Sequence, residues 1–229
     1  MLMIVNSKVK ALQRQAGYTL VELSISVAII SVLIVTGLYG VPRILETNKI
    51  SNTVQQVSIA NANYSKLAAQ TGSGAFAYTA TYAAATSSPL AGMGIFPDEA
   101  ILRNGSIAYG VKHPFNGSIY SKSVGLPITG FLGVDEGYIL KLENVPAKNC
   151  FAMASAFGNT AVQISVDAPA TAPTTSAITT SAATVETANG GGAAVIVKQA
   201  GQTLTASTLA SQCALNPTVV KNIYLWFAY

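Results

Sequence analysis

The sequence predicts an α+β fold in which one long N-terminal helix packs on an antiparallel sheet. An uncharged apolar stretch near the N-terminus is followed at once by apolar residues at helical spacing. Later in the chain, short segments rich in β-branched and aromatic residues lie between turn-forming residues, as strands do. With 229 residues, the chain is long enough for one globular domain attached to such a helix.

The apolar stretch has the length of a membrane-spanning helix. Residues 23–42 provide 20 positions without a formal charge, and at 1.5 Å per residue such a helix spans about 30 Å, the thickness of a bilayer core. Lys8, Lys10 and Arg14 precede it, and no acid does. The positive-inside bias therefore predicts that the segment before the helix stays in the cytoplasm and that the chain after it is exported.

One acid, Glu22, lies near the start of this apolar stretch. A carboxylate in such a place is costly unless it has a partner. Cleavage between Gly17 and Tyr18 would keep the apolar segment on the mature chain and place a new amine about one helical turn from Glu22. The two groups could pair within one chain or between neighbouring chains, where an unpaired buried charge is penalised. The alternative is a plain signal anchor whose acid lies near the lipid headgroups.

Gly17, the apolar run and Glu22 at the fifth position after the expected cut resemble the processing site of type IV prepilins. The resemblance implies that a membrane aspartyl prepilin peptidase cuts after Gly17 and N-methylates Tyr18. It also implies that Glu22 pairs with the amine of an adjacent subunit during filament assembly. Tyr18 departs from the phenylalanine or methionine that the family more often has at this position. The leader, residues 1–17, is longer than type IVa leaders and favours type IVb.

After the transmembrane segment, residues 18–43, the pattern predicts that the same helix continues over residues 44–69 with one apolar stripe. Pro42 lacks a donor N–H, so we expect it to kink the helix or melt it locally. The bend is either a flexible point that helps subunits fit a filament or a harmless kink at the membrane exit. The apolar stripe consists of Ile50, Val54, Val57, Ala60, Tyr64 and Leu67. The polar side of the helix consists of Asn48, Lys49, Ser51, Asn52, Gln55 and Gln56.

The exported part, residues 44–229, is expected to form one head with short strands and helices. Residues 71–92 are expected to be an irregular link. Residues 168–193 are expected to be an exposed loop, either a tolerated insertion or a recognition or glycosylation face. The last strand is apolar on both faces and is predicted to be central or covered, with a subunit contact as the alternative. Strands are predicted at residues 138–142, 161–166, 194–198 and 223–227, and short helices at residues 98–103, between Pro146 and Gly158, and at residues 209–213.

Two cysteines, Cys150 and Cys213, fall in the exported part. An even number of cysteines in an oxidising compartment predicts one disulfide bond. The strand that ends in Leu142-Glu-Asn-Val-Pro, the helix with Cys150, and the late Cys213 before the closing strand resemble the C-terminal region of type IVb pilins. The toxin-coregulated pilins and the thin-pilus pilins of conjugative plasmids are examples. The resemblance implies that residues 150–213 form the family's disulfide-bounded region.

Composition and motifs favour a structural protein and not an enzyme. The formal charge is +4, but the leader contributes +3, so the mature chain has 10 basic and 9 acidic side chains and no predicted nucleic-acid face. The sequence has no phosphate-binding loop, no His-Glu-x-x-His and no Gly-x-Ser-x-Gly motif. Its single histidine, His113, precedes Pro114 and is predicted to be an extended surface residue. No cofactor or metal is expected, since the cysteines lack Cys-x-x-Cys spacing.

The predicted function is therefore that of the major structural subunit of a type IVb pilus. The expected partners are other copies of the chain in a helical homopolymer, the prepilin peptidase and the inner-membrane assembly machinery. The chain is expected in the inner membrane of a Gram-negative bacterium, with its head in the periplasm, and then in an extracellular pilus. The alternatives are a minor pilin, a secretion pseudopilin, a pilus-tip adhesin and a monomeric signal-anchored protein.

Overall fold

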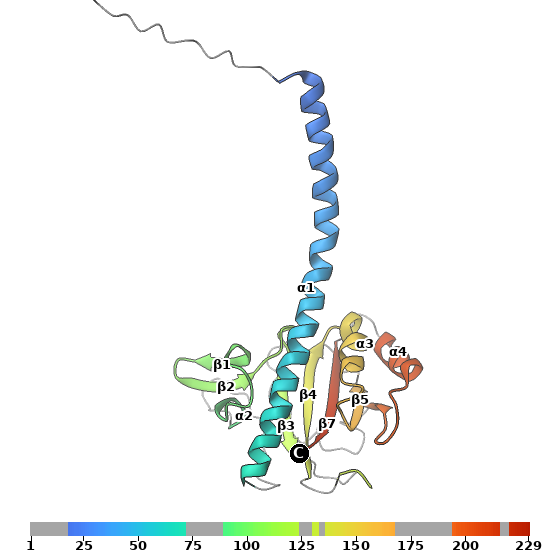
Figure 1. Cartoon of the computed structure of the whole chain (residues 1–229). Helices are drawn as coiled ribbons and strands as arrows, with labels where there is room; N and C mark the ends of the chain where they lie inside the picture. The colour runs from blue at the N-terminus through green and yellow to red at the C-terminus, as the bar shows by residue number, and fades with distance from the viewer. Residues whose placement is uncertain (1–17, 72–88, 124–129, 133–135, 168–193, 216–219) are drawn as a thin grey trace, which may run out of the picture. The chain divides into compact units, whose positions relative to one another are not determined.

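The computed structural model describes residues 18–71, 89–123, 130–132, 136–167, 194–215 and 220–229 (Figure 1). The expectations for the leader with Gly17, for most of the link and for the low-complexity loop lie outside these residues. The chain divides into two units, Met1–Leu45 and Glu46–Tyr229.

The long N-terminal helix predicted from the sequence is confirmed as α1, Leu20–Thr71. Its residues up to Leu45 belong to the first unit, and the large apolar side chains there are exposed. The helix runs through Pro42 without losing its helical backbone. Local melting, one of the two predicted effects of this proline, is therefore not observed, because the flanking turns keep their helical conformation around the missing N–H. The kink stays a prediction.

The second unit contains a five-stranded sheet in the order β3-β4-β7-β5-β6, and every neighbouring pair is antiparallel. The four strands predicted here are confirmed, and the last strand is central, as predicted for a segment that is apolar on both faces. One edge strand was not predicted, because Ile119-Tyr-Ser-Lys-Ser has few β-branched residues. The strands are β3 (Ile119–Ser123), β4 (Gly137–Val145), β5 (Gln163–Asp167), β6 (Val195–Lys198) and β7 (Lys221–Ala228).

A smaller antiparallel pair follows the short helix α2 (Pro89–Gly92) and consists of β1 (Ile101–Asn104) and β2 (Ile107–Val111). The helix predicted over residues 98–103 is wrong beyond its first turn. Only Asp98–Ala100 is helical, as a 3-10 turn. The reason is the tight turn at Gly105, whose φ of 58° suits glycine and returns the chain as a strand.

Two further helices, α3 (Ala147–Ala156) and α4 (Ala206–Ala214), agree with the predicted short helices. A disulfide between Cys150 and Cys213 joins them, with 5.6 Å between the Cα atoms. Lys148 at the start of α3 also donates a hydrogen bond to the carboxylate of Glu46 on α1. The cysteine pair predicted from the sequence therefore closes a loop of 63 residues in the head.

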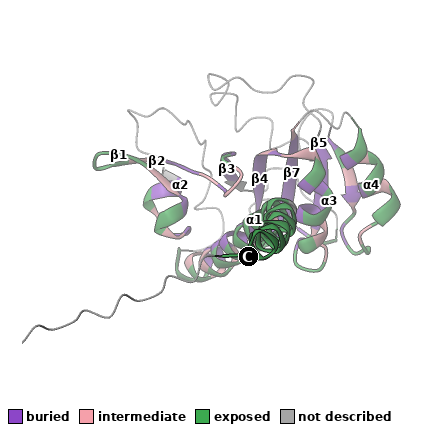
Figure 2. Ribbon diagram, turned by 90° about the horizontal axis from the view of Figure 1, so that it is seen from above, coloured by how far each residue is buried: buried purple, intermediate pink, exposed green. Residues whose placement is uncertain are grey.

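The main core lies between the sheet and the helices on one of its faces (Figure 2). From α1, Val57, Ala60 and Tyr64 are fully buried in this core, and the ring of Tyr64 stacks on Tyr138 of β4. The apolar stripe predicted for this half of the helix therefore packs as expected. The predicted polar side is not wholly solvated, because Gln56 is only 6% exposed.

The opposite face of the sheet contains a buried ion pair. Lys141 and Glu143 lie two positions apart on β4, and Lys141 Nζ is 2.9 Å from a carboxylate oxygen of Glu143. The hydroxyl of Tyr120 donates a hydrogen bond of 3.2 Å to the other carboxylate oxygen. Burial and the negative charge of Glu143 raise the pKa of the Tyr120 hydroxyl. Removing Lys141 or Glu143 would leave an uncompensated buried charge, and the hydrogen bond from Tyr120 links β3 to this pair.

Candidate assembly site

The candidate assembly site is the beginning of α1, where Thr19 serves as the N-cap. Its side-chain oxygen accepts a hydrogen bond of 3.2 Å from the N–H of Glu22, and its carbonyl accepts one of 3.1 Å from Leu23. Thr19 and Glu22 thus have the spacing of a capping box, in which the hydroxyl satisfies a free N–H of the first turn. This cap was not predicted from the sequence, although Thr-x-x-Glu before an apolar run is its recognised signature.

Glu22 lies in the first turn, where the partial positive charge of the helix N-terminus favours a carboxylate. Glu22 is exposed, and no described residue forms an ion pair with it. Tyr18, the expected first mature residue, precedes the cap and is 80% exposed. The structure therefore places Tyr18 and Glu22 at the same end of one helix, both accessible to a second molecule.

The hydroxyl side chains within the apolar half of α1 are satisfied by their own helix. Ser24, Ser26, Ser31 and Thr36 each donate to a backbone carbonyl three or four residues earlier, at 2.7 to 3.0 Å. Such bonds remove the hydrogen-bonding demand of these groups, so the helix can be surrounded by lipid or by other helices. The polar residues of this segment therefore do not interrupt its apolar surface.

That surface is apolar all round. Between Leu20 and Leu45, the large apolar residues are at least half exposed, and an 18-residue window of the helix has a mean hydropathy of 2.3 with none of it buried. By length and composition, α1 is apolar enough to cross a membrane. A helix with no polar face needs an apolar environment on every side.

The other predicted site residues belong to other parts of the chain. Pro42 lies within α1, and the disulfide of Cys150 and Cys213 lies in the head. His113 is the clearest correction, because it is 1% exposed and not a surface residue. It lies in the turn of a hairpin that is closed by the bridge between Lys112 and Ser118, and this turn packs against the end of β4. No group of three or more metal-ligating side chains occurs in the part of the chain that the structure describes.

Comparison with known families gives one match. Residues 12–38 match the model of the prokaryotic N-terminal methylation motif. The matched range includes Gly17, Tyr18 and Glu22. A search of curated proteins finds no match.

Two crystal structures of pilins are similar to the chain. One is a type IV b pilin from Salmonella typhi, with 12% identity over 76% of this chain and 97% of that chain and a TM-score of 0.43. The other is TcpA, a type IV pilin from Vibrio cholerae El Tor. It has 14% identity over 79% of this chain and 99% of that chain, and a TM-score of 0.49.

The N-terminal methylation motif leads into an exposed apolar helix, and the same helix continues into an α+β head with an antiparallel sheet. This combination is type IV pilin-like.

Proposed function

We propose that the chain is the major structural subunit of a type IVb pilus. The observation that supports this most directly is the start of α1. An N-terminal methylation motif coincides there with a helix that is apolar on all sides and has one accessible acid in its first turn. A helix of this kind is unsuited to water, and an accessible carboxylate on it needs a cationic partner.

The proposed maturation begins in the inner membrane. A prepilin peptidase removes residues 1–17 after Gly17 and methylates the amine of Tyr18. Residues 18–43 hold the subunit in the bilayer, and residues 44–229 form the head on the periplasmic side. The region bounded by Cys150 and Cys213 belongs to this head and is held by the disulfide. These assignments follow from the charge of the leader and from the resemblance to type IV prepilins.

The proposed assembly moves the apolar helix from lipid into a bundle of identical helices. Lipid and helix bundle are similarly apolar, so the transfer itself provides little driving force, and packing and polar pairs decide the arrangement. Pairing of Glu22 with the methylated amine of Tyr18 on a neighbouring subunit would remove a large penalty for two buried charges. Pro42 would allow the helix to bend as the subunit enters the fibre. The result is a helical homopolymer that leaves the cell as an extracellular pilus.

Intact-mass spectrometry of protein sheared from cell surfaces, compared with the membrane fraction, tests this proposal. We expect an abundant sheared species that lacks residues 1–17, gains one methyl group and lacks two hydrogens at its cysteines. A minor pilin, a pseudopilin or a tip adhesin would be scarce in the sheared material. A full-length chain confined to the membrane would contradict the proposal and indicate a signal-anchored protein.

A further inference from the structure

The tetrapeptide Asn-Gly-Ser-Ile occurs twice in the chain, at residues 104–107 and at residues 116–119. Asparagine before glycine is the pair in which a side-chain amide most readily reacts with the backbone, because glycine has no Cβ to shield the next amide nitrogen. The two copies share the reactive pair and the two residues that follow it. A difference in their reactivity in the folded protein therefore depends mainly on the surrounding structure.

The first copy forms the exposed turn between β1 and β2. Asn104 pairs with Ile107, so Gly105 and Ser106 make a two-residue turn. The φ of Gly105 is 58°, as a hairpin turn of this length requires at its first central residue. Residues 104–107 are all exposed, and no described residue lies within 4 Å of the place where a Cβ of Gly105 would be. The peptide group after Asn104 therefore has room to rotate.

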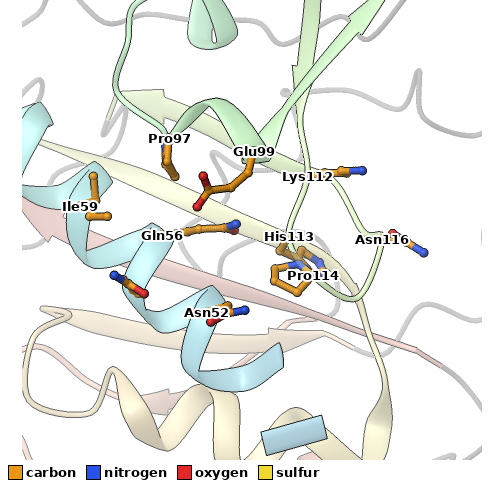
Figure 3. Close-up of a pocket in the computed structure, with 10 residues that line it drawn as sticks. Asn52, Gln56, Ile59, Pro97, Glu99, Lys112, His113, Pro114 and Asn116 are labelled. Carbon is orange, nitrogen blue, oxygen red and sulfur yellow. The ribbon is translucent and has the colours of Figure 1, made fainter. Parts of the chain in front are cut away.

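The second copy lies in the packed turn that contains His113. The side chain of Asn116 is exposed, and Figure 3 shows it pointing away from α1. The next residue, Gly117, is buried, and a Cβ there would be 1.7 Å from the Glu143 carbonyl oxygen and 2.3 Å from His113 Nε2. The N–H of Asn116 donates to the carbonyl of His113, and the N–H of His113 donates to the carbonyl of Gly117, each at 2.9 Å. The peptide group after Asn116 therefore cannot rotate unless the turn leaves β4.

Deamidation of asparagine needs this rotation. The backbone nitrogen of the glycine loses its proton to hydroxide and attacks the side-chain carbonyl carbon of the asparagine. The new bond between nitrogen and carbon closes a succinimide ring, and the side-chain amide group takes up a proton and leaves as ammonia. Water then opens the ring at either carbonyl and gives aspartate or isoaspartate. The net reaction takes up one water and releases one ammonia, and it needs no oxidant, cofactor or enzyme.

We propose that Asn104 is a site of spontaneous deamidation and that the packing of Gly117 protects Asn116 from the same reaction. The product places a negative charge next to Arg103, whose guanidinium pairs with Asp98 at 2.8 Å. Where isoaspartate forms, the backbone of the turn gains one carbon, and the pairing across the turn is disturbed. Old and new copies of the chain would therefore differ in charge and in backbone at this hairpin. The reaction needs neither leader cleavage nor assembly, so it is independent of the proposed function.

The test is peptide mapping of the full chain in detergent after incubation at pH 8 and 37 °C, compared with an unincubated sample. Trypsin cuts after Arg103, Lys112 and Lys122, so the two asparagines fall in different peptides, residues 104–112 and 113–122. Chromatography that separates aspartate from isoaspartate, followed by mass spectrometry, measures each product. We expect Asn104 to react at least about tenfold faster than Asn116, because the free energy of opening the packed turn adds to the barrier at Asn116.

The same incubation in guanidinium chloride is the matched control, because unfolding removes the packing and leaves two identical tetrapeptides. The two rates should then become similar. His113→Ala removes the ring beside Gly117 and should speed the reaction at Asn116 while Asn104 is unchanged, with Trp226 fluorescence verifying that the head is folded. Equal rates in the folded native chain, or an Asn104 that reacts only in denaturant, would overturn the proposal whether or not this variant folds.

Discussion

The two parts of α1 differ in where their apolar residues find contacts. Up to Leu45 the helix is apolar on every side, and its large side chains are exposed. From Glu46 onward the apolar residues form one stripe, and Val57, Ala60 and Tyr64 on this stripe are fully buried in the head. The first part therefore needs contacts that the single chain does not provide, whereas the second part is satisfied by its own domain.

This difference separates assembly from stability. Substitutions in the exposed part should change how subunits meet while the head stays folded. Substitutions in the buried part should change the free energy of unfolding of the head, with assembly affected only as a consequence. The same change made once in each part of one helix is therefore an informative experiment.

The largest expected effect is the loss of filaments in Glu22→Ala. Without the carboxylate, the amine of Tyr18 would enter the helix bundle unpaired, and an isolated buried charge is strongly unfavourable. Membrane insertion and leader cleavage should persist, because the apolar stretch and Gly17 are unchanged. Electron microscopy of sheared material and the mass of the membrane-bound chain measure the two outcomes.

Glu46→Ala is the matched control for this prediction, since it removes the next acid of α1. Glu46 pairs with Lys148, and both side chains are partly exposed, so the loss should cost less than about 1 kcal/mol. Filaments should therefore form normally. Normal fibres from Glu22→Ala would exclude the proposed pairing and leave Glu22 only its position in the capping box with Thr19.

The next effect in size is the destabilisation of the head by Tyr64→Ala. Tyr64 is fully buried, stacks on Tyr138 with 4.0 Å between ring centroids, and donates a hydrogen bond to the side chain of Ser121. Truncation of a large buried side chain costs about 3 to 5 kcal/mol. Urea unfolding followed by Trp226 fluorescence measures this loss. Ile30→Ala, in the exposed part, should leave the unfolding midpoint of the head unchanged, and an equal loss in both variants would contradict the division of α1.

Much of this arrangement was predictable from the sequence, because it depends on local patterns. The run of uncharged apolar residues predicted the part of α1 that is exposed in the single chain. The gaps of three and four between Val57, Ala60 and Tyr64 predicted the buried stripe. The apolar character of the last strand predicted its central position, which β7 has. Each of these features follows from apolar residues that recur at a regular spacing within one segment. Predicting them therefore required no knowledge of contacts between distant segments.

The features that the sequence did not predict depend on contacts between distant segments. His113 is buried because its turn packs on Glu143, thirty positions later, and no local pattern reveals that contact. The two copies of Asn-Gly-Ser-Ile likewise differ in their packing because the carbonyl of the distant Glu143 lies against Gly117. The Thr19 cap was the exception, since its signature is local and was visible in the sequence.

The smallest of the three expected effects is a loss of head stability in acid that depends on His113. Burial lowers the pKa of its imidazole from 6.5 to about 4, and the hydrogen bond to the Glu143 carbonyl opposes this only in part. Between these two values the unfolded chain binds a proton that the folded chain does not, so stability falls as the pH falls from about 6.5 to about 4. Below that range both states are protonated and the loss is complete. Its size is about 3 kcal/mol.

Urea unfolding at pH 7.5 and at pH 4 measures this dependence, and His113→Gln is the variant that isolates it. Glutamine can still donate to the Glu143 carbonyl but has no proton to gain. Every other titratable side chain is the same in the two proteins, so the difference between the two pH dependences reports the histidine alone. We expect the variant to be less stable than the native chain at pH 7.5, because the ring packs more tightly, and to lose about 3 kcal/mol less on acidification. Equal losses in the two proteins would show that His113 is accessible to protons in the folded head, and would contradict the close packing of its turn against β4.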